Sequence, residues 1–475
     1  MDSEAAGKGP GISRRSFLAG AGAGLAAGIP LAWLAQQGLR NLHSSSLESQ
    51  FNGRSAEDKS PRFGMPGRFP GRVVEVRHPE SVRVDHSVSA DAVKKMMDRG
   101  MCELTGADYA TEAWRSFFQP GDRVGIKVNP VGMQGDRRDV VGAISSPAVL
   151  LEIVEGLKSA GVSPRHIIVF ERYAREFRRA GYEAVMRERA MDDIRWYASS
   201  ADGGNLQVDI EGYDGERDLD PHVVGYDPDV FVQMNFAHPQ HDPRDDRRLR
   251  SHLSVIVTRM VDKVITIPVL KDHRSAGVTM ALKNLSHGFS NNVARSHIDS
   301  IYRLDHFRTG PNQCNTFIPT AAAQMPLRAK ATLHILDGLI GVYEGGPGTW
   351  NRTWATWPYK ALFFATDPVA MDHVGWDIID GKRVREGWLP VAKMGLMQDA
   401  PPDVQLLLAR KVAALAAAGS IDSNSLSKAA QRYLDGRETE VFDRRTPEHI
   451  YLAGTVGLGV FDAERIEHRR IELPA

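Results

Sequence analysis

Cysteine is scarce in this sequence, and neither sign of charge is in excess. The 475 residues include only Cys102 and Cys314, too few for a disulfide scaffold, a cysteine-rich zinc site or an all-cysteine iron–sulfur cluster. We therefore expect no iron–sulfur cluster of its own, while a bond between the two cysteines stays open. Lysine plus arginine equals aspartate plus glutamate at 59 each, so no global field attracts nucleic acid or an anionic membrane surface. We expect no nucleic-acid partner.

The first 40 residues have the pattern of an export signal. Arg14 and Arg15 lie in a twin-arginine signature at residues 13–18, and the Gly/Ala-rich segment 19–35 follows without a charge until Arg40. The pattern predicts export by the twin-arginine translocase, to the periplasm or to the outer side of the cytoplasmic membrane. Cleavage after Ala35 and retention as an N-terminal membrane anchor both stay open. Because this route carries folded proteins, often with a cofactor inserted, it favours a cofactor.

After a Ser-, Gly- and Pro-rich linker at residues 41–71, the apolar pattern alternates between strand and helix spacing. The expected elements are a strand at 73–76, a helix at 91–104, a strand at 123–130, a helix after the N-cap Ser146, and strands at 166–170, 331–337 and 361–365. This alternation is typical of βαβ units. We predict an α/β domain over residues 72–475, with a mostly parallel sheet, helices on both faces and an active-site cleft at the strand ends. It is one domain or two lobes that divide near residues 240–260.

The stretch at residues 262–297 is the expected centre of the site. Its apolar start at 264–269 predicts a buried strand closed by Pro268, and residues 278–285 predict a helix. Ionisable side chains are dense where the apolar strand stops. Loops at the carboxyl ends of strands open into the crevice where open α/β folds bind ligands, so we expect the loop after this strand to carry catalytic groups.

Lysine and histidine dominate the expected chemistry. If Lys127, Lys271 and Lys283 converge, they form a cationic pocket for a carboxylate or phosphate, and burial with mutual repulsion lowers the pKa of at least one amine. Such a lysine acts as a base or nucleophile. His273 is the natural general acid or base at neutral pH. The expected catalytic residues are His273, Lys271 and Lys283.

Polar residues at other strand ends complete the expected site. We expect Asp272 or Asp337 to fix the tautomer of His273. The expected substrate-binding residues are Lys127, Asn129, Asn284 and Asp337. The strand ends predicted to open into one cleft are those at Lys127, Lys271, Asp337 and Asp367. Asp367 is also a plausible helix cap before Pro368.

Histidines supply most candidate metal ligands. The expected ligands of a divalent transition metal, such as nickel, iron or zinc, are His287, His297 and Asp372, with His306 as an alternative to Asp372. His238 and His241, three residues apart beside aspartates, are a second candidate pair without a defined third ligand. Each histidine has an alternative as a helix-end or loop residue whose ring is satisfied by hydrogen bonds.

These residues together resemble a known family. The motifs are Lys271-x-His273, Thr279 with Lys283-Asn284, Asp337-Gly338, Gly346-Pro347 and the run 367–372. Occurring in this order from about Arg123 onward, they resemble the bacterial and archaeal DUF362 family, a domain of unknown function. The resemblance implies a fold but no particular activity. Many members carry ferredoxin-type iron–sulfur modules, for which this chain lacks the cysteines.

Residues 262–297 are also similar to the central element of nickel-pincer lactate racemases. The similar positions are residues 262–267, His273, Ala276-Gly277 and Lys283. This resemblance implies that His273 exchanges a proton or hydride with the substrate, that Lys283 tethers the nickel cofactor and that His297 ligates nickel. Residues 280–282 replace the Gly-rich turn that those enzymes carry before the lysine.

Two function classes follow from these patterns. The first is an exported, metal- or cofactor-dependent enzyme, an isomerase or hydrolase, that acts on a small anionic substrate by proton transfer or metal-assisted hydrolysis. The second is a non-catalytic exported protein that binds an anion or a metal. The grouping of histidine with lysine favours the enzyme, because a simple anion binder more often uses arginines and backbone amides.

Overall fold

In the computed structural model the chain divides into two units, Met1–Pro61 and the compact unit Arg62–Ala475. The structure describes residues 64–189, 191–201, 220–233, 250–273, 275–291, 293, 296, 314–351, 353–388, 390–391 and 446–475. The predicted export signal and most of the linker lie outside these residues, as do His238, His241, His297 and His306. Within the described residues, no helix combines the length and the apolar character needed to cross a membrane.

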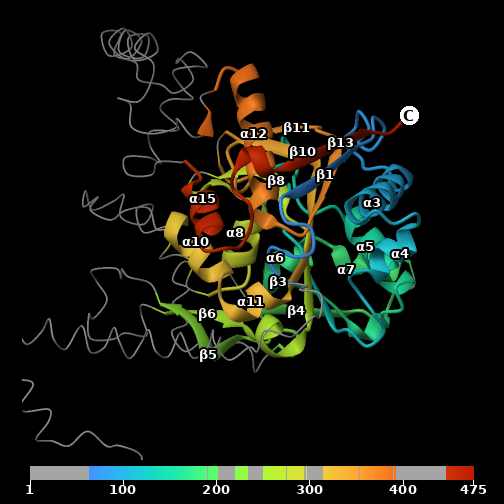
Figure 1. Cartoon of the computed structure of the whole chain (residues 1–475), viewed down its shortest axis with the longest axis vertical. Helices are drawn as coiled ribbons and strands as arrows, with labels where there is room; N and C mark the ends of the chain where they lie inside the picture. The colour runs from blue at the N-terminus through green and yellow to red at the C-terminus, as the bar shows by residue number, and fades with distance from the viewer. Residues whose placement is uncertain are drawn as a thin grey trace, which may run out of the picture. The chain divides into compact units, whose positions relative to one another are not determined.

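The described part of the second unit is built on an 11-stranded mixed sheet (Figure 1). Its strands are β1 (Arg72–Arg77), β2 (Val124–Lys127), β3 (Ile167–Tyr173), β4 (Arg195–Ser200), β7 (Lys263–Thr266), β8 (Val269–His273), β9 (Gly277–Val278), β10 (Ala331–Glu344), β11 (Ala355–Trp357), β12 (Ala361–Ala365) and β13 (Glu467–Glu472). The main order is β13-β1-β12-β10-β7-β2-β3-β4, with β8 and β11 paired to β10 and β9 paired to β8. A separate antiparallel pair joins β5 (Tyr226–Gln233) to β6 (Arg250–Ser254).

The chain adds its parallel strands to opposite sides of the sheet from β2 and from β7, which are themselves parallel. From β2 the chain continues to β3 and β4 on one side, whereas β7 and β10 lie on the other side of β2. Connections that leave the two strands therefore diverge, and such a switch point opens a crevice at the carboxyl ends. Lys127, the last residue of β2, pairs with Thr266, the last residue of β7. The predicted α/β fold with a mostly parallel sheet is confirmed.

Helices cover both faces of this sheet (Figure 1). They are α3 (Ala90–Thr105), α4 (Ala110–Arg115), α5 (Pro147–Ser159), α6 (Ala174–Arg179), α7 (Tyr182–Arg187), α8 (Met280–His287), α10 (Cys314–Ala322), α11 (Met325–Lys330), α12 (Pro368–Arg385) and α15 (Glu448–Thr455). Successive residues of β3 alternate between two apolar cores. Ile167 and Val169 join the core under α3, α4 and α5, and Ile168 and Phe170 join the core under α8, α10 and α12. Burial of both faces explains the uninterrupted apolar run at residues 167–170 of β3.

Several predicted elements are confirmed, and the predicted ends of four strands, β2, β3, β7 and β10, are wrong. Ser146 and Asp367 cap α5 and α12 as predicted. The strand predicted over residues 264–269 stops at Thr266 and resumes after Pro268 as β8, which runs to His273. Pro268 therefore interrupts the strand, because proline has no N–H for the ladder. As a result, Lys271 and His273 lie on a strand and not in a loop, and β10 likewise runs on to Glu344.

The two cysteines do not pair. Cys102 lies half-buried in α3, and Cys314 is buried at the start of α10. Both are free thiols in this structure.

Candidate functional site

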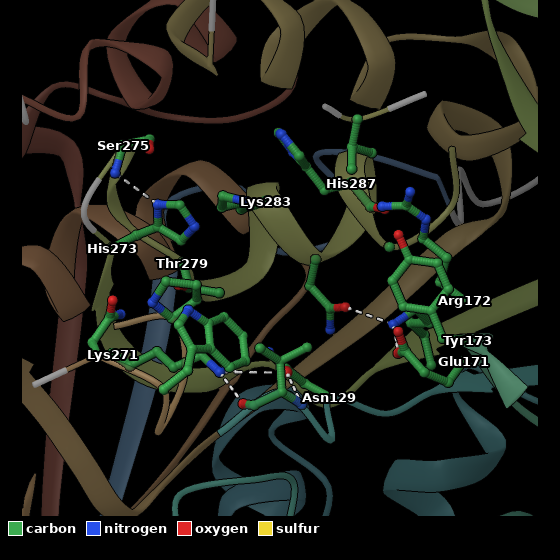
Figure 2. Close-up of a pocket in the computed structure, with 18 residues that line it drawn as sticks. Asn129, Glu171, Arg172, Tyr173, Lys271, His273, Ser275, Thr279, Lys283 and His287 are labelled. Carbon is green, nitrogen blue, oxygen red and sulfur yellow. Dashed lines mark hydrogen bonds and ion pairs between the residues drawn. The ribbon is translucent and has the colours of Figure 1, made fainter. Parts of the chain in front are cut away.

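A cavity of about 460 Å³ lies at the carboxyl ends of β2, β3 and β8 (Figure 2). Its lining residues are Lys127, Asn129, Val131, Glu171, Arg172, Tyr173, Lys271, His273, Ser275, Thr279, Lys283, Asn284, His287, Gly288, Val293, Pro347, Trp350 and Asn351. In the view of Figure 2, Lys271, His273 and Ser275 lie toward one end and Arg172 and Tyr173 toward the other. All three predicted lysines line this one cavity.

The start of α8 is fixed by a strained turn and a buried acid. Gly277 has a φ of +78°, a left-handed conformation that glycine adopts without steric cost, and Met280 has a φ of +30°. The Asp372 carboxylate of α12 accepts the N–H groups of Ala281 at 2.7 Å and Leu282 at 2.9 Å. These bonds hold the first turn of the helix, which carries Lys283, against α12.

Lys127 is a buried lysine with a full set of acceptors. Its Nζ donates to the Glu171 carboxylate, to the Val128 carbonyl oxygen at 2.7 Å and to Asn284 Oδ1 at 3.1 Å. Burial lowers the pKa of Lys127, and the negative charge of Glu171 opposes that shift. Gly288 packs against the lysine stem, where a Cβ would lie 2.7 Å from Lys127 Cε.

Lys271 is fully buried and only partly satisfied. Its Nζ donates to the Val131 carbonyl oxygen and, at 3.4 Å, to Asn129 Oδ1. Burial, followed by the charge of Lys283, lowers the pKa of Lys271 to about 7. Because an ammonium has three N–H groups, one is left for a ligand when this amine is protonated.

Lys283 is buried, with 8% of its surface exposed, and it lines the cavity. It makes no hydrogen bond and no ion pair with any residue that the structure describes. Burial lowers its pKa to about 8. The positive charge of Arg172 acts in the same direction, whereas Cys314 opposes it. At pH 8 about half of this amine is therefore neutral and has a free lone pair.

Backbone amides, and not an acid, fix the His273 ring. Its Nδ1 accepts the N–H groups of Ser275 at 3.0 Å and Ala276 at 3.1 Å. A ring nitrogen that accepts two such bonds carries no proton, so the proton lies on Nε2. The prediction that Asp272 or Asp337 sets this tautomer is wrong. In this tautomer the Nε2–H group is a hydrogen-bond donor.

Asp272 instead anchors the Gly-rich loop after β10. Its carboxylate accepts the N–H of Gly346 at 2.7 Å and of Gly345 at 3.2 Å. Arg383, buried in α12, lies 3.8 Å from this carboxylate and 2.6 Å from Glu344. The anchored loop continues to Trp350, which lines the cavity and is 64% exposed.

Asn284 and Tyr173, which line the cavity, each bury a polar atom that has no partner among the described residues. Asn284 Nδ2 is buried without an acceptor, although Oδ1 of the same side chain binds Lys127. The Tyr173 hydroxyl is also buried without a partner. Buried polar groups are nearly always hydrogen-bonded in folded proteins, so these two atoms are candidates to bind a ligand.

The aspartates at neighbouring strand ends are structural. Asp337, predicted to bind substrate, accepts the backbone N–H groups of Ser146 and Leu339 and does not line the cavity. Asp367 accepts four backbone N–H groups, two of them from Gly71 and Val460. Burial raises the pKa of Asp337 and Asp367 to about 6 and that of Asp372 to about 8. Of the four strand ends expected in one cleft, those at Lys127 and Lys271 converge and those at Asp337 and Asp367 do not.

The predicted metal ligands do not form a site within the described residues. His287 lines the cavity, but its ring nitrogens lie 3.1 Å from Ser286 Oγ and 2.7 Å from Ser296 Oγ. Asp372 is occupied by the amides of α8 and lies off the cavity. The described residues contain no group of three or more His, Cys, Asp and Glu side chains that could hold a metal, and His297 lies outside them.

Sequence analysis missed one wall of the cavity. Glu171, Arg172 and Tyr173 follow the predicted strand at 166–170 directly and contribute the partner of Lys127, a further cation and an unpartnered hydroxyl. Their position at a strand end was the signal that could have found them. Trp350 had no such signal, because its place depends on how the Gly-rich loop folds back.

Comparison with known proteins identifies one family. The family model "Domain of unknown function (DUF362)" matches residues 234–377. No curated protein matches the sequence. Among solved structures, the lactate racemase apoprotein from Thermoanaerobacterium thermosaccharolyticum is similar at 11% identity, with 84% of this chain and 83% of that chain covered and a TM-score of 0.32. A structural-genomics crystal structure of a protein from Thermotoga maritima has 9% identity, 82% and 88% coverage and a TM-score of 0.35. Residues 234–377, the segment that carries Lys271, His273 and Lys283, thus match the DUF362 family model.

Proposed function

We propose that this protein is an enzyme that binds a small anionic substrate in the cavity and transfers a proton with its buried lysines. The observation that carries the proposal is the pair Lys271 and Lys283, two buried amines in one cavity with pKa values of about 7 and about 8. General acids and bases work best when their pKa lies near the operating pH. Both amines meet that condition at neutral pH.

The charge of the lining supports an anion as substrate. Lys127, Arg172, Lys271 and Lys283 line the cavity, and among the lining residues that the structure describes Glu171 is the one acid. Glu171 is paired with Lys127, so no described lining acid is left to neutralise Lys271 and Lys283. A carboxylate or phosphate in the cavity would offset their charge.

Several of the lining residues have distinct roles in the proposed reaction. Arg172 and Asn284 Nδ2 hold the anionic group, and Nε2–H of His273 donates to an oxygen at the reacting carbon. Lys271 takes up or returns the proton, because its neutral form is well populated at pH 7. Trp350 and Pro347 line the site.

Exchange of hydrogen with solvent tests the proposal. The full chain is incubated in D₂O with short 2-hydroxy, 2-amino and 2-oxo carboxylates, and proton NMR follows deuterium entry at the carbons next to the functional group. We expect exchange with at least one of these acids. We expect Lys271→Met to slow exchange by about 100-fold or more, the usual contribution of a general acid or base.

The matched control is Lys158→Met, which removes an exposed lysine of α5 that pairs with Glu155. This variant should exchange like the wild type. If the wild type binds one of these anions, as shown by calorimetry, but exchanges none, the alternative of a non-catalytic anion-binding protein replaces the enzyme.

Export and a metal remain separate proposals that rest on sequence alone. Arg14 and Arg15 support export by the twin-arginine translocase to the periplasm, with the N-terminal segment cleaved or kept as an anchor. The spacing of His273, Lys283 and His297 supports a divalent transition metal, either nickel, iron or zinc. Because the described residues supply no ligand set, no step of the proposed proton transfer runs through a metal.

A further inference from the structure

The three lysines of the cavity differ in how many hydrogen-bond acceptors they have. Lys127 has three acceptors and Lys271 has two. Lys283 has none among the described residues. A buried lysine held only for structure or charge needs acceptors, because an unpaired buried ammonium is costly. The missing acceptors therefore indicate a lysine that works in its neutral form.

We propose that Lys283 is a nucleophile that captures the carbonyl carbon of a small 2-oxo carboxylate as an imine. This inference rests on the proposed function and names its substrate class. Neutral lysine amines in desolvated, cation-rich pockets form Schiff bases with carbonyl substrates. Lys283 meets these conditions, since it is buried, lines the cavity and lies in the field of Arg172.

The cavity offers groups for every part of such a substrate. Asn284 Nδ2 and the Tyr173 hydroxyl, both buried and unpartnered, can donate to the carboxylate. His273, with its proton on Nε2, can donate to the carbonyl oxygen. In Figure 2 Lys283 and His273 lie at the same end of the pocket, away from Tyr173.

The step balances without a further reagent. The lone pair of Lys283 Nζ attacks the carbonyl carbon, and the carbonyl oxygen takes up the proton that Nζ loses, which gives a neutral carbinolamine. A solvent proton then joins the new hydroxyl group, which leaves as water, and the C=N bond to Nζ that remains is protonated. This cationic imine acidifies the neighbouring C–H group, whose proton passes to the neutral amine of Lys271 to give an enamine, and the return of a solvent proton reverses the sequence.

Borohydride trapping tests the inference on the full chain. Pyruvate or glyoxylate is mixed with the protein at pH 8, sodium borohydride reduces any imine to a stable secondary amine, and peptide mass mapping locates the adduct. We expect one reduced adduct, on the peptide that contains Lys283. Its yield should rise between pH 6 and pH 9, with a midpoint near the pKa of about 8. Lys283→Met should lose the adduct, and Lys158→Met should keep it.

Mapping of the wild type makes the test independent of whether a variant folds. An adduct spread over surface lysines, or none at all, overturns the inference. A Lys283 peptide that already carries extra mass before any carbonyl compound is added also overturns it, because that amine is then not available. Deuterium exchange without a borohydride-dependent adduct would rule out the imine at Lys283 but would still support the proposed proton transfer. An adduct at Lys283 without deuterium exchange would support imine formation at Lys283 and would rule out the proposed proton transfer.

Discussion

Lys127 and Lys283 are buried lysines at two parts of one cavity, yet only Lys127 has an acidic partner. Around Lys127, the Glu171 carboxylate and two carbonyl-type oxygens satisfy the ammonium. Around Lys283, the described residues offer no acceptor, and the neighbouring Asn284 Nδ2 is unsatisfied as well. The same side-chain chemistry is thus structural at one part and reactive at the other.

Lys283 also differs from the nearby buried aspartates in how many hydrogen bonds its charged group makes. Asp367 and Asp372 are as deeply buried as Lys283, but backbone amides saturate both carboxylates. Burial of a charged group therefore does not mark a functional site in this molecule. Unused hydrogen-bonding capacity next to a cavity is the more informative signal.

The largest expected effect comes from breaking the satisfied pair. Lys127→Met leaves Glu171 buried without its cation, and removal of one partner of a buried ion pair typically costs about 3–5 kcal/mol. We expect urea denaturation to show a loss of that size in the free energy of unfolding. The double variant Lys127→Met with Glu171→Gln should recover part of the loss. A single variant as stable as wild type would show that the pair is not held in the folded protein.

An intermediate effect of opposite sign is expected at Lys283. Its folded-state pKa of about 8 lies below the ordinary value of 10.5, so the wild type loses stability as pH falls from 10.5 through 8. Methionine does not titrate and has similar volume. Lys283→Met should therefore be more stable than wild type by about 2–3 kcal/mol below pH 8, with the difference vanishing near pH 10.5. Urea denaturation across this range measures it, and a difference that does not change with pH would contradict the assigned shift.

The smallest effect is expected for the unpartnered hydroxyl. Tyr173→Phe removes a group that makes no hydrogen bond among the described residues, so the free energy of unfolding should change by less than about 0.5 kcal/mol. Tyr359 provides a matched control, because its hydroxyl donates to Glu75 at 2.6 Å. Tyr359→Phe should cost about 1.5–3 kcal/mol, the range for hydrogen bonds to charged groups. Equal losses in the two variants would erase the contrast between satisfied and unsatisfied groups.

Features set by nearby residues were predictable from the sequence. The N-caps Ser146 and Asp367 lie directly before the apolar periodicity and proline that start their helices, and both were found. Lys127 and Lys271 were expected in one cleft because each belongs to the end of an apolar strand segment, and they share the cavity. Caps and strand ends depend on a few consecutive residues, which is why the pattern sufficed.

Features set by distant residues were not predictable. Asp337 and Asp372 were assigned to substrate and metal, but each accepts N–H groups of another element, such as Ala281. No local pattern tells which amides a carboxylate meets. The strand after Pro268 was missed for the same reason, because β8 exists through pairing with β10.

The order in which the ribosome makes the chain determines when the strand pairing of the sheet can be completed. β1 is the first strand of the described fold, and it pairs only with β12 and β13, two of the last to be made. Asp367 repeats this link, because its carboxylate binds both Gly71 and Val460. Until residue 472 has emerged, β1 keeps an unpaired edge that can recruit other chains. Completion of the sheet is therefore a late event of biosynthesis, and a nascent chain that stops before β13 leaves β1 exposed along one side.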